Sequence, residues 1–530
     1  MNWTDVIPVI RLELVLIGAA CVLFLLGLSK NVFVRQLSPV VALMALVIVF
    51  VAQLVTQREA FSVLKDPVNA IRVGALGQYI KLLSAGVGAM LVLLSWPTDK
   101  DGGGNSALRF GSDTSGEYFA LLLLSISGIF LVAGANDVIL LFLGIELASI
   151  PTYVMVSISR PLPVAQEAGV KYFFLGAMAA AVLIFGFSYL YGSTGLIDLN
   201  LIARQITRSI QDGAIVPALS AWMKLGVVLI IAALAFKIAA FPLHFYAGDV
   251  YEGAATPVTA LLSFVPKTAG FVALLKVLWS VSGGSWRLPA DLVTLIMVLA
   301  GLTMTVGNVL GLMQHNVKRV LAYSSISHTG YMLVGVSAIL GGNEDQGLSG
   351  VLFYLTAYGI MNVAAFGVLM LLPSRDGRVA TSAETFEDLA GMGRERVGLG
   401  LAMAVACFSL TGLPLTVGFF GKLYLIRAAL GAGQTLLVIV LLINAAISAG
   451  YYLRIVGVMF LRSRPQDIVN TGDAPAPIRG VPILFAVTIS TVVTLLLGTV
   501  FPATEIVRLR VQESTNVDVR TSVTDSVAQP

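Results

Sequence analysis

Long apolar runs recur along almost the whole of this 530-residue sequence, and they constrain its fold more than any other feature. A run of about 20 apolar residues is long enough for a helix to cross the hydrocarbon core of a membrane. Windows of this length predict about 14 membrane-spanning helices. The predicted spans are 8–28, 37–56, 75–95, 117–134, 137–159, 165–191, 222–245, 255–280, 289–313, 318–341, 347–373, 397–431, 434–461 and 480–502.

The residue composition agrees with an all-α polytopic membrane protein. Hydrophobic residues make up 57% of the chain and charged residues 12%, which is about half the charged fraction of a soluble protein. Helices are the expected spanning elements, because backbone groups inside a bilayer must satisfy their hydrogen bonds within the segment. The net charge of +4 is small and scattered, so a nucleic-acid partner is not expected.

Cysteine and histidine usage argues against a cofactor or metal held by this chain. Cys21 and Cys407 are isolated in apolar runs, and two such residues cannot ligate an iron–sulfur cluster or zinc. The three histidines, His244, His315 and His328, make paired haem ligation a poor prediction. The sequence also lacks a G-x-G-x-x-G dinucleotide fingerprint followed by an acidic residue.

Lysines and arginines in the loops predict the orientation. Most of them follow odd-numbered spans, so these loops should be cytoplasmic and both termini should lie outside. The segment 194–213 is amphipathic and too polar to span, which predicts a place at the membrane interface. Residues 374–398 form the longest charged loop.

Two predicted spans share an interruption. "FKIAAFPLHF" (236–245) and "FSLTGLPLTVGFFGK" (408–422) each combine a Pro-Leu pair with a nearby lysine, in spans seven and twelve. Paired broken helices are typical of inverted-repeat transporters, and a five-helix repeat reverses the second copy in the membrane. The predicted divisions are N-terminal helices 1–116, a first five-helix repeat 117–280, a second five-helix repeat 281–465, a C-terminal helix 466–505 and a polar tail 506–530.

Ionisable residues lie well inside the predicted spans. A charge at the bilayer centre costs about 2.5–3.5 kcal/mol on insertion scales, so such residues should face one another or internal water. Burial lowers the pKa of a lysine and a nearby carboxylate raises it again. A lysine under both influences can exchange a proton near neutral pH. Snorkelling to the interface is the alternative, chiefly for lysines and arginines near span ends. The residues are Glu146, Lys171, Lys237, Lys267, His328, Lys422 and Arg454.

Four stretches resemble the antiporter-like membrane subunits of respiratory complex I. They are "GIELASIPTY" (144–153), "FKIAAFPLHFYAGDVYEGAATPVTALLSFVPKTAGF" (236–271), "NVKRVLAYSSISHTGY" (316–331) and "TGLPLTVGFFGKLY" (411–424). Within that family, "DVYEGA" and the lysine of "FFGK" are most similar to the N subunits of bacterial NADH:quinone oxidoreductase. The resemblance covers about residues 117–460.

This resemblance implies a proton channel through the chain. Glu146 and Lys237 would form the interacting carboxylate–lysine pair of a first half-channel. Lys267 and His328 would carry a central hydrophilic axis. Lys422 would be the terminal lysine of a second half-channel.

The resemblance also matches Lys171 to an extra lysine of span six and implies partners. Membrane and peripheral subunits of complex I, including neighbouring antiporter-like subunits, would hold NADH, FMN, iron–sulfur clusters and quinone, and the chain would reside in a bacterial inner membrane.

Two other classes of function stay open: a multi-subunit Na⁺/H⁺ antiporter subunit and an independent solute transporter. The "DVYEGA" form argues against the first, and the line of single titratable groups argues against the second.

Overall fold

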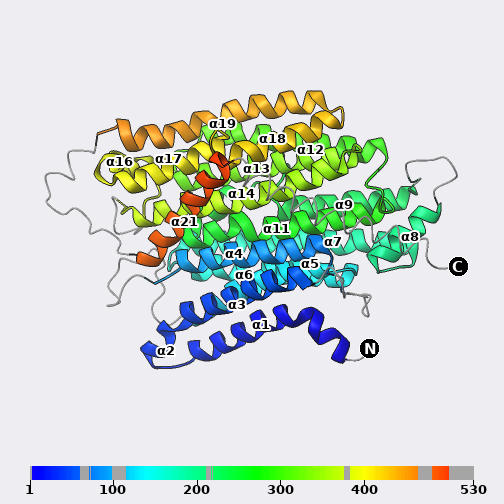
Figure 1. Cartoon of the computed structure of the whole chain (residues 1–530), viewed down its shortest axis with the longest axis horizontal. Coiled ribbons are helices and arrows are strands. Elements are labelled where there is room, and N and C mark those ends of the chain that lie inside the picture. The colour runs from blue at the N-terminus through cyan, green and yellow to red at the C-terminus, as the bar shows by residue number, and fades with distance from the viewer. Residues whose placement is uncertain are drawn as a thin grey trace.

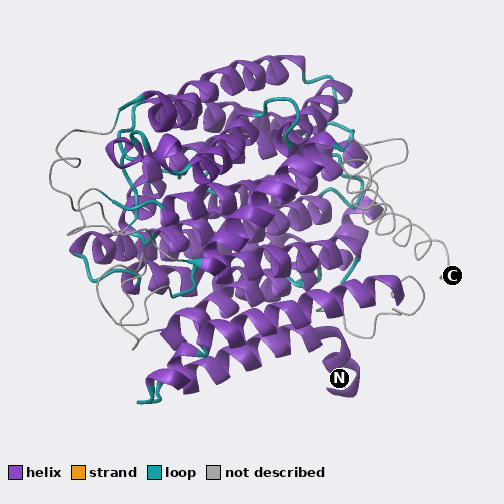
Figure 2. Cartoon of the chain, turned by 60° about the vertical axis from the view of Figure 1, so that its left-hand side comes forward, coloured by secondary structure: helices purple, strands orange, loops and turns teal. Residues whose placement is uncertain are grey.

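The computed structural model folds the chain into a bundle of helices (Figures 1 and 2). The residues that it describes are 3–59, 71, 73–97, 115–209, 217, 219–374, 382–463 and 480–500. These residues contain no β-strand, and eleven of their helices are long and apolar enough to cross a membrane. The predicted class, an all-α polytopic membrane protein, is therefore confirmed. The predicted polar tail, 506–530, lies outside the described residues.

Helices of the first half end close to the limits of the apolar windows. They are α1 (Trp3–Gly27), α2 (Val32–Gln36), α3 (Ser38–Glu59), α4 (Ala75–Leu94), α5 (Ser115–Gly134), α6 (Val138–Ile158), α7 (Pro163–Thr194), α8 (Leu199–Ser209), α9 (Ala221–Lys237), α10 (Tyr246–Gly253) and α11 (Thr256–Val281). Local signals set several of these starts. Asp137 caps α6 by accepting hydrogen bonds from two backbone N–H groups. Helices α7 and α11 have a proline in the first turn, where a backbone N–H would have no partner within the helix.

Helices of the second half follow the same rule. They are α12 (Ala290–Leu312), α13 (Val317–Leu340), α14 (Glu344–Leu371), α15 (Phe386–Leu389), α16 (Met392–Glu395), α17 (Val397–Thr411), α18 (Val417–Gly431), α19 (Thr435–Leu461) and α21 (Val481–Thr499). The charged loop after α14 thus contains two short helices. Asn316 caps α13 through the N–H groups of Lys318 and Arg319.

Three of the predicted windows depart from a plain spanning helix. Window 222–245 contains α9, which stops at Lys237. Window 397–431 is divided between α17 and α18. Window 318–341 is a single helix, α13, but it carries too many polar residues to count among the apolar spans. These three windows carry Lys237, Lys422 and His328, which are three of the predicted functional residues.

Helices α11 and α14 form the centre of the bundle. Every residue in the membrane-length window of α11 is buried, and so are 94% of those in α14. The outer helices α1 and α3 bury only 28% and 39% of theirs. Figure 1 shows this layering, with α1 and α3 at one edge, α19 at the other and α11 between them. Apolar side chains on the outer helices remain exposed, as expected for surfaces that face lipid or partner subunits.

The segments that connect the long helices lie at two opposite ends of the bundle. Figure 1 places α2 and α16 at its left-hand end and α8 at its right-hand end. The first two belong to loops after odd-numbered windows and α8 to a loop after an even one, which agrees with the predicted alternation. The amphipathic segment that contains α8 packs its buried face on α11. That face consists of Leu199, Ile202, Ala203 and Ile206.

Candidate functional site

The first break places a lysine at the end of a buried helix. Helix α9 ends at Lys237, residues 238–245 are not helical, and α10 then begins at Tyr246. The Tyr246 hydroxyl donates a 2.9 Å hydrogen bond to the Phe236 carbonyl, which closes the break over the helix end. The break lies in the protein interior, where irregular backbone is tolerated at membrane depth.

Lys237 points at one face of α6. Its ammonium group lies 2.8 Å from Glu146 Oε1, 3.1 Å from Ser149 Oγ and 3.1 Å from the Tyr153 hydroxyl. Those three residues are spaced three and four apart, so they share a helix face. The three N–H donors of the lysine thus all have partners. The side chains are 3% exposed for Lys237 and 13% for Glu146, which makes this a nearly buried ion pair.

A small cavity connects this pair to the next lysine. It is lined by Lys237 and Lys267 and by Tyr172, Tyr246 and Tyr251, among others. Its volume, ≈ 10 Å³ of space for the centre of a water-sized sphere, is about that of one water position. A single water molecule between the two ammonium groups would connect them by hydrogen bonds.

Lys267 comes from the central helix α11 and is buried. It donates to both the carbonyl and the hydroxyl of Ser325 on α13, and its ammonium group lies 5.5 Å from the centre of the Tyr358 ring. No carboxylate forms an ion pair with it among the described residues. Backbone and hydroxyl oxygens, with a π face, therefore hold this cation.

His328 lies one turn further along α13 and is also buried. Its Nδ1 is 2.6 Å from the Tyr354 hydroxyl on α14, and its Nε2 is 3.0 Å from the Tyr452 hydroxyl on α19. Both ring nitrogens are therefore engaged, each by a group that can donate or accept a proton. This imidazole joins three helices in the middle of the bundle.

The second break holds the last lysine. Helix α17 ends at Thr411, α18 begins at Val417, and Lys422 donates to the Leu410 and Thr411 carbonyls at 3.2 and 2.6 Å. Its ammonium group also lies 4.7 Å from the centre of the Tyr331 ring, and Tyr331 is one turn from His328. Lys422 thus binds the free end of a broken helix, where the unpaired carbonyls of the last turn favour a cation.

Lys171 lies apart from the other predicted residues. It is 46% exposed on α7, and it forms ion pairs with Glu167 at 2.6 Å and with Asp249 at 3.4 Å. Asp249 also accepts a hydrogen bond from Arg319 at 3.0 Å. Five of the six residues that the family resemblance matched to the proton channel therefore follow one buried line, and Lys171 belongs to a surface network beside it.

Buried tyrosines were not predicted from the sequence, yet they contact the three lysines and the histidine of that line. Their hydroxyls hydrogen-bond to Lys237 and His328, and their rings face Lys267 and Lys422. A signal existed, because hydroxyl-bearing aromatics recur inside the apolar spans, where a polar atom needs a partner. The residues are Tyr153, Tyr331, Tyr354, Tyr358 and Tyr452.

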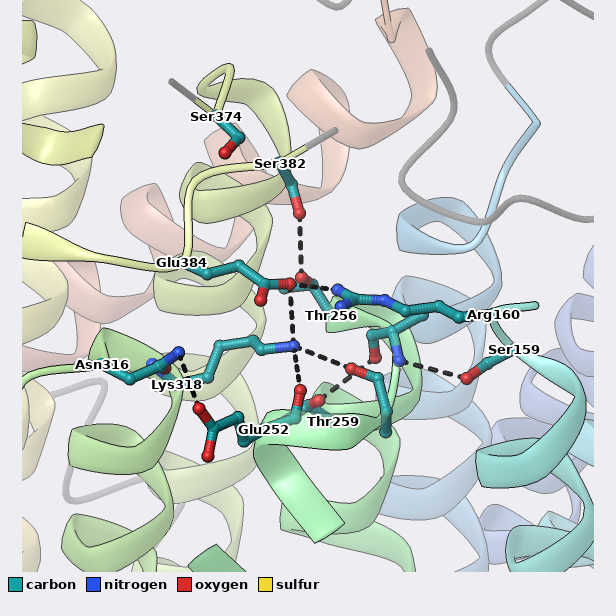
Figure 3. Close-up of polar contacts among 12 residues, drawn as sticks. Ser159, Arg160, Glu252, Thr256, Thr259, Asn316, Lys318, Ser374, Ser382 and Glu384 are labelled. Atoms are coloured by element: carbon teal, nitrogen blue, oxygen red, sulfur yellow. Dashed lines mark hydrogen bonds and ion pairs between the residues drawn. The ribbon is translucent and has the colours of Figure 1, made fainter. Parts of the chain in front are cut away.

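A second polar cluster closes one end of the bundle (Figure 3). Glu384, in the segment before α15, pairs with Arg160 after α6 and with Lys318 at the start of α13, the latter at 2.9 Å. Lys318 also donates to the Glu252 and Ala254 carbonyls at 2.9 and 2.8 Å. We call Arg160, Lys318 and Glu384 the loop clasp.

The loop clasp holds a charged carboxylate. Burial opposes ionisation of Glu384, but Lys318 and Arg160 outweigh it and hold the pKa of this carboxyl below its usual value. Thr256 and Ser382 add a hydroxyl–hydroxyl contact of 3.1 Å beside it. The loop clasp thus ties the ends of four helices from both halves of the chain.

Comparison with known proteins places this geometry in context. Residues 135–448 match the model of a family described as "NADH:quinone oxidoreductase/Mrp antiporter, TM". A relative from Sorangium cellulosum (strain So ce56), named NADH-quinone oxidoreductase subunit N 1, is 40% identical over 395 residues, which are 74% of this chain and 75% of the relative.

Solved structures agree on the fold. A chain of respiratory complex I from Thermus thermophilus with bound aureothin superposes with a TM-score of 0.69 at 28% identity, over 93% of this chain and 98% of that one. A chain of the Mrp complex from Dietzia sp. DQ12-45-1b has a TM-score of 0.77 at 19% identity, over 98% of this chain and 100% of that one. The second likeness concerns the fold alone.

Proposed function

This chain belongs to the family of NADH:quinone oxidoreductase and Mrp antiporter membrane subunits, and on that premise we propose that it is the proton-translocating N subunit of an NADH-quinone oxidoreductase. The relatives' names support this assignment over an Mrp-type Na⁺/H⁺ antiporter, to which the likeness is one of fold. Its place would be the inner membrane of a bacterium, beside neighbouring antiporter-like subunits.

One observation carries the mechanism: a buried line of titratable groups runs between two broken helices. The order is the Lys237–Glu146 pair, the small cavity, Lys267, His328 and Lys422. A proton on Lys237 can pass to Glu146 across the 2.8 Å contact, or through a water in the cavity towards Lys267. Each buried group discourages net charge on its neighbours, so protons would move along the line in sequence.

Between the central lysine and the terminal lysine, the hydroxyls beside His328 extend the path. Tyr354 and Tyr452 can each give a proton to one ring nitrogen while the other nitrogen releases one. The imidazole would thereby transfer a proton without moving far. Lys422 would then release it beside the second break.

Electron transfer belongs, in this proposal, to other subunits. NADH, FMN, iron–sulfur clusters and quinone would be bound there, and redox events would reach this chain through its contacts with membrane and peripheral partners. This subunit is thus a non-redox part of the enzyme, and its chemistry is proton transfer alone.

We further infer about 14 spans arranged as two inverted five-helix repeats, 117–280 and 281–465, flanked by 1–116 and 466–505. The interrupted helices, α9 with α10 and α17 with α18, support this pairing. The loop charges support a cytoplasmic position for the loop clasp and an outer position for α8 and both termini.

Replacing Lys237 with alanine tests the proposal. In membrane vesicles that contain the assembled enzyme, Lys237→Ala should leave NADH oxidation by the peripheral subunits intact but abolish proton uptake. Lys224→Ala is the matched control, because Lys224 is a lysine in the same helix that pairs with Asp291 at the surface. Proton uptake equal to the control would refute the role of Lys237 and of the line it begins.

A further inference from the structure

A second carboxylate–lysine pair is buried among the N-terminal helices. Glu13 on α1 and Lys81 on α4 approach to 2.6 Å between Oε1 and Nζ, with side chains 3% and 2% exposed. The Lys81 ammonium group also lies 5.8 Å from the centre of the Phe130 ring on α5. This pair is more deeply buried than Glu146 with Lys237, and it is not part of the line described above.

The pair is incompletely satisfied. Glu13 Oε2 is buried without a hydrogen-bond partner, and so is Ser84 Oγ, one helical turn from Lys81. A buried ion pair stabilises the fold only when further hydrogen bonds satisfy its remaining lone pairs. Because one carboxylate oxygen of Glu13 has no such bond, a contribution to stability alone does not explain the pair. Such open buried atoms are usual binding points for internal water.

The position of the pair suggests an outlet. Glu13 is four residues inside the apolar span that begins at Val9, and Lys81 is six residues from the start of α4, so Glu13 lies about 6 Å from the start of that span and Lys81 about 9 Å from the start of its helix. The same face contains the end of α5, since a Cβ on Gly134 would stand 4.0 Å from Glu13 Oε1. This is the face that the loop charges predict to be outside.

A third cation lies at this face. Lys276 on α11 donates to the Ala133 and Ala135 carbonyls, both at 2.7 Å. These two residues flank Gly134, which approaches Glu13. Lys276 is on the same helix as Lys267, nine residues further on, which is about 14 Å along the axis. Helix α11 thus extends from the central lysine to the neighbourhood of the N-terminal pair.

We propose that Glu13 and Lys81 form an additional proton-exchange site that releases protons at the face where α1 begins. This inference rests on the proposed function of the chain. A proton that moves from Lys81 Nζ to Glu13 Oε1 breaks an N–H bond and makes an O–H bond, which leaves both groups neutral. Lys81 then accepts a second proton from within the bundle, and the O–H bond at Glu13 Oε1 breaks as its proton passes to water, while water at Oε2 stabilises the carboxylate that re-forms, so one proton enters for each that leaves.

Removing both charges together separates this role from a structural one. A buried pair replaced by apolar residues of similar volume usually keeps or gains stability. The double variant Glu13→Leu/Lys81→Met should therefore assemble into the enzyme, but its protons translocated per NADH oxidised should fall. The matched control is Lys224→Met/Asp291→Leu, which removes a surface pair at 2.8 Å and should keep the full ratio.

Glu13→Gln is the second variant, because the amide keeps the shape and can still accept a hydrogen bond from Lys81. It should lower the same ratio and should remove a carboxyl band from the redox-induced infrared difference spectrum. An unchanged ratio in the double variant, or an unchanged spectrum in Glu13→Gln, would overturn the proposal. Lys237→Ala, measured in parallel, keeps the two claims apart: if only that variant fails to pump, the proposed function stands and this inference falls.

Discussion

The two broken helices hold their lysines in different ways. Lys237 donates to a carboxylate and two hydroxyls on a neighbouring helix, with Glu146 at 2.8 Å. Lys422 donates to two backbone carbonyls at the end of its own broken segment, Leu410 and Thr411. The first lysine has a partner that can take its proton, whereas the second has only acceptors that cannot.

In the proposed mechanism, this difference separates the tasks of the two sites. A carboxylate partner lets the first site pass between an ion pair and a neutral pair, which matches a group that loads and unloads protons. Backbone carbonyls accept hydrogen bonds from an ammonium group but cannot take its proton. In the proposed mechanism, release from Lys422 would therefore depend on water or on the neighbouring Tyr331 and His328 rather than on a paired acid.

The largest expected contrast concerns assembly after lysine removal. Lys237→Ala leaves Glu146 without its cation, and breaking a buried pair in this way costs about 3–5 kcal/mol. Lys422→Ala leaves only two carbonyls unpaired, which costs about 1–3 kcal/mol. Both variants should lose proton transport, but Lys237→Ala should yield less assembled enzyme, as measured by native gels and thermal inactivation.

Adding Glu146→Gln to Lys237→Ala removes the stranded charge, so assembly should recover while transport stays absent. A larger assembly defect in Lys422→Ala than in Lys237→Ala would contradict the comparison.

The next effect concerns the acid itself. Glu146→Gln keeps a hydrogen-bond acceptor for Lys237 but removes the carboxylate that can take its proton. Proton uptake should fall severalfold without disappearing. Ser149→Asp, added to that variant, should restore part of it, because Ser149 Oγ is already 3.1 Å from the Lys237 ammonium group. Ser149→Asp alone is the control, and no recovery in the double variant would argue against an acid–lysine couple.

A smaller effect is expected at the second break, where Gly412 lies against Lys422. Gly412 has φ +87°, and a Cβ there would stand 2.8 Å from Lys422 Cδ. Gly412→Ala should cost about 1–2 kcal/mol from the left-handed backbone alone. Gly433, at φ +74° with open space around it, is the matched control for that strain. Any transport defect in Gly412→Ala beyond that of Gly433→Ala then reports displacement of the lysine; equal effects would show that the contact is unimportant.

Much of this architecture could be predicted from the sequence, because membrane-length apolar runs determine where helices lie. Each predicted window contains a helix, and the Pro-Leu interruptions at 236–245 and 408–422 mark real breaks. Buried charge also limits the possible arrangements, since a cation at membrane depth needs a partner. This physical demand predicts that the buried groups face one another or internal water, and the family resemblance added the pairing of Glu146 with Lys237.

The remaining features depend on packing that no single helix encodes. Lys171 resembles the other span lysines in sequence, but its helix turns it outward to Glu167 and Asp249. Glu13 and Lys81 lie far apart in the chain, and their meeting depends on how α1 and α4 pack around α5. The roles of the buried groups in proton transfer remain predictions.

The smallest expected effect is the pH response of the loop clasp. The loop clasp differs from the Lys237 and Lys422 sites because its carboxylate, Glu384, pairs with two cations. The pKa of Glu384 is held below its usual value, against the effect of burial, by Lys318 and Arg160. Its ionised form therefore contributes full stability above the unfolded-state pKa of about 4.3, and this contribution is lost as the pH falls through the lower folded-state pKa.

Hydrogen exchange across residues 382–389 should consequently accelerate only below about pH 4.3 in the unmodified chain. In Glu384→Gln the exchange should be faster at neutral pH, because Lys318 and Arg160 then repel each other without a carboxylate between them, and the acid-dependent step attributable to Glu384 should vanish. Asp388 accepts the backbone N–H bonds of Glu384 and Thr385 at 3.0 and 2.9 Å, so Asp388→Asn provides a control that loosens the same segment while keeping Glu384. If Glu384→Gln retained the full acid step, Glu384 would not be its source, and the pH response predicted for the loop clasp would be wrong.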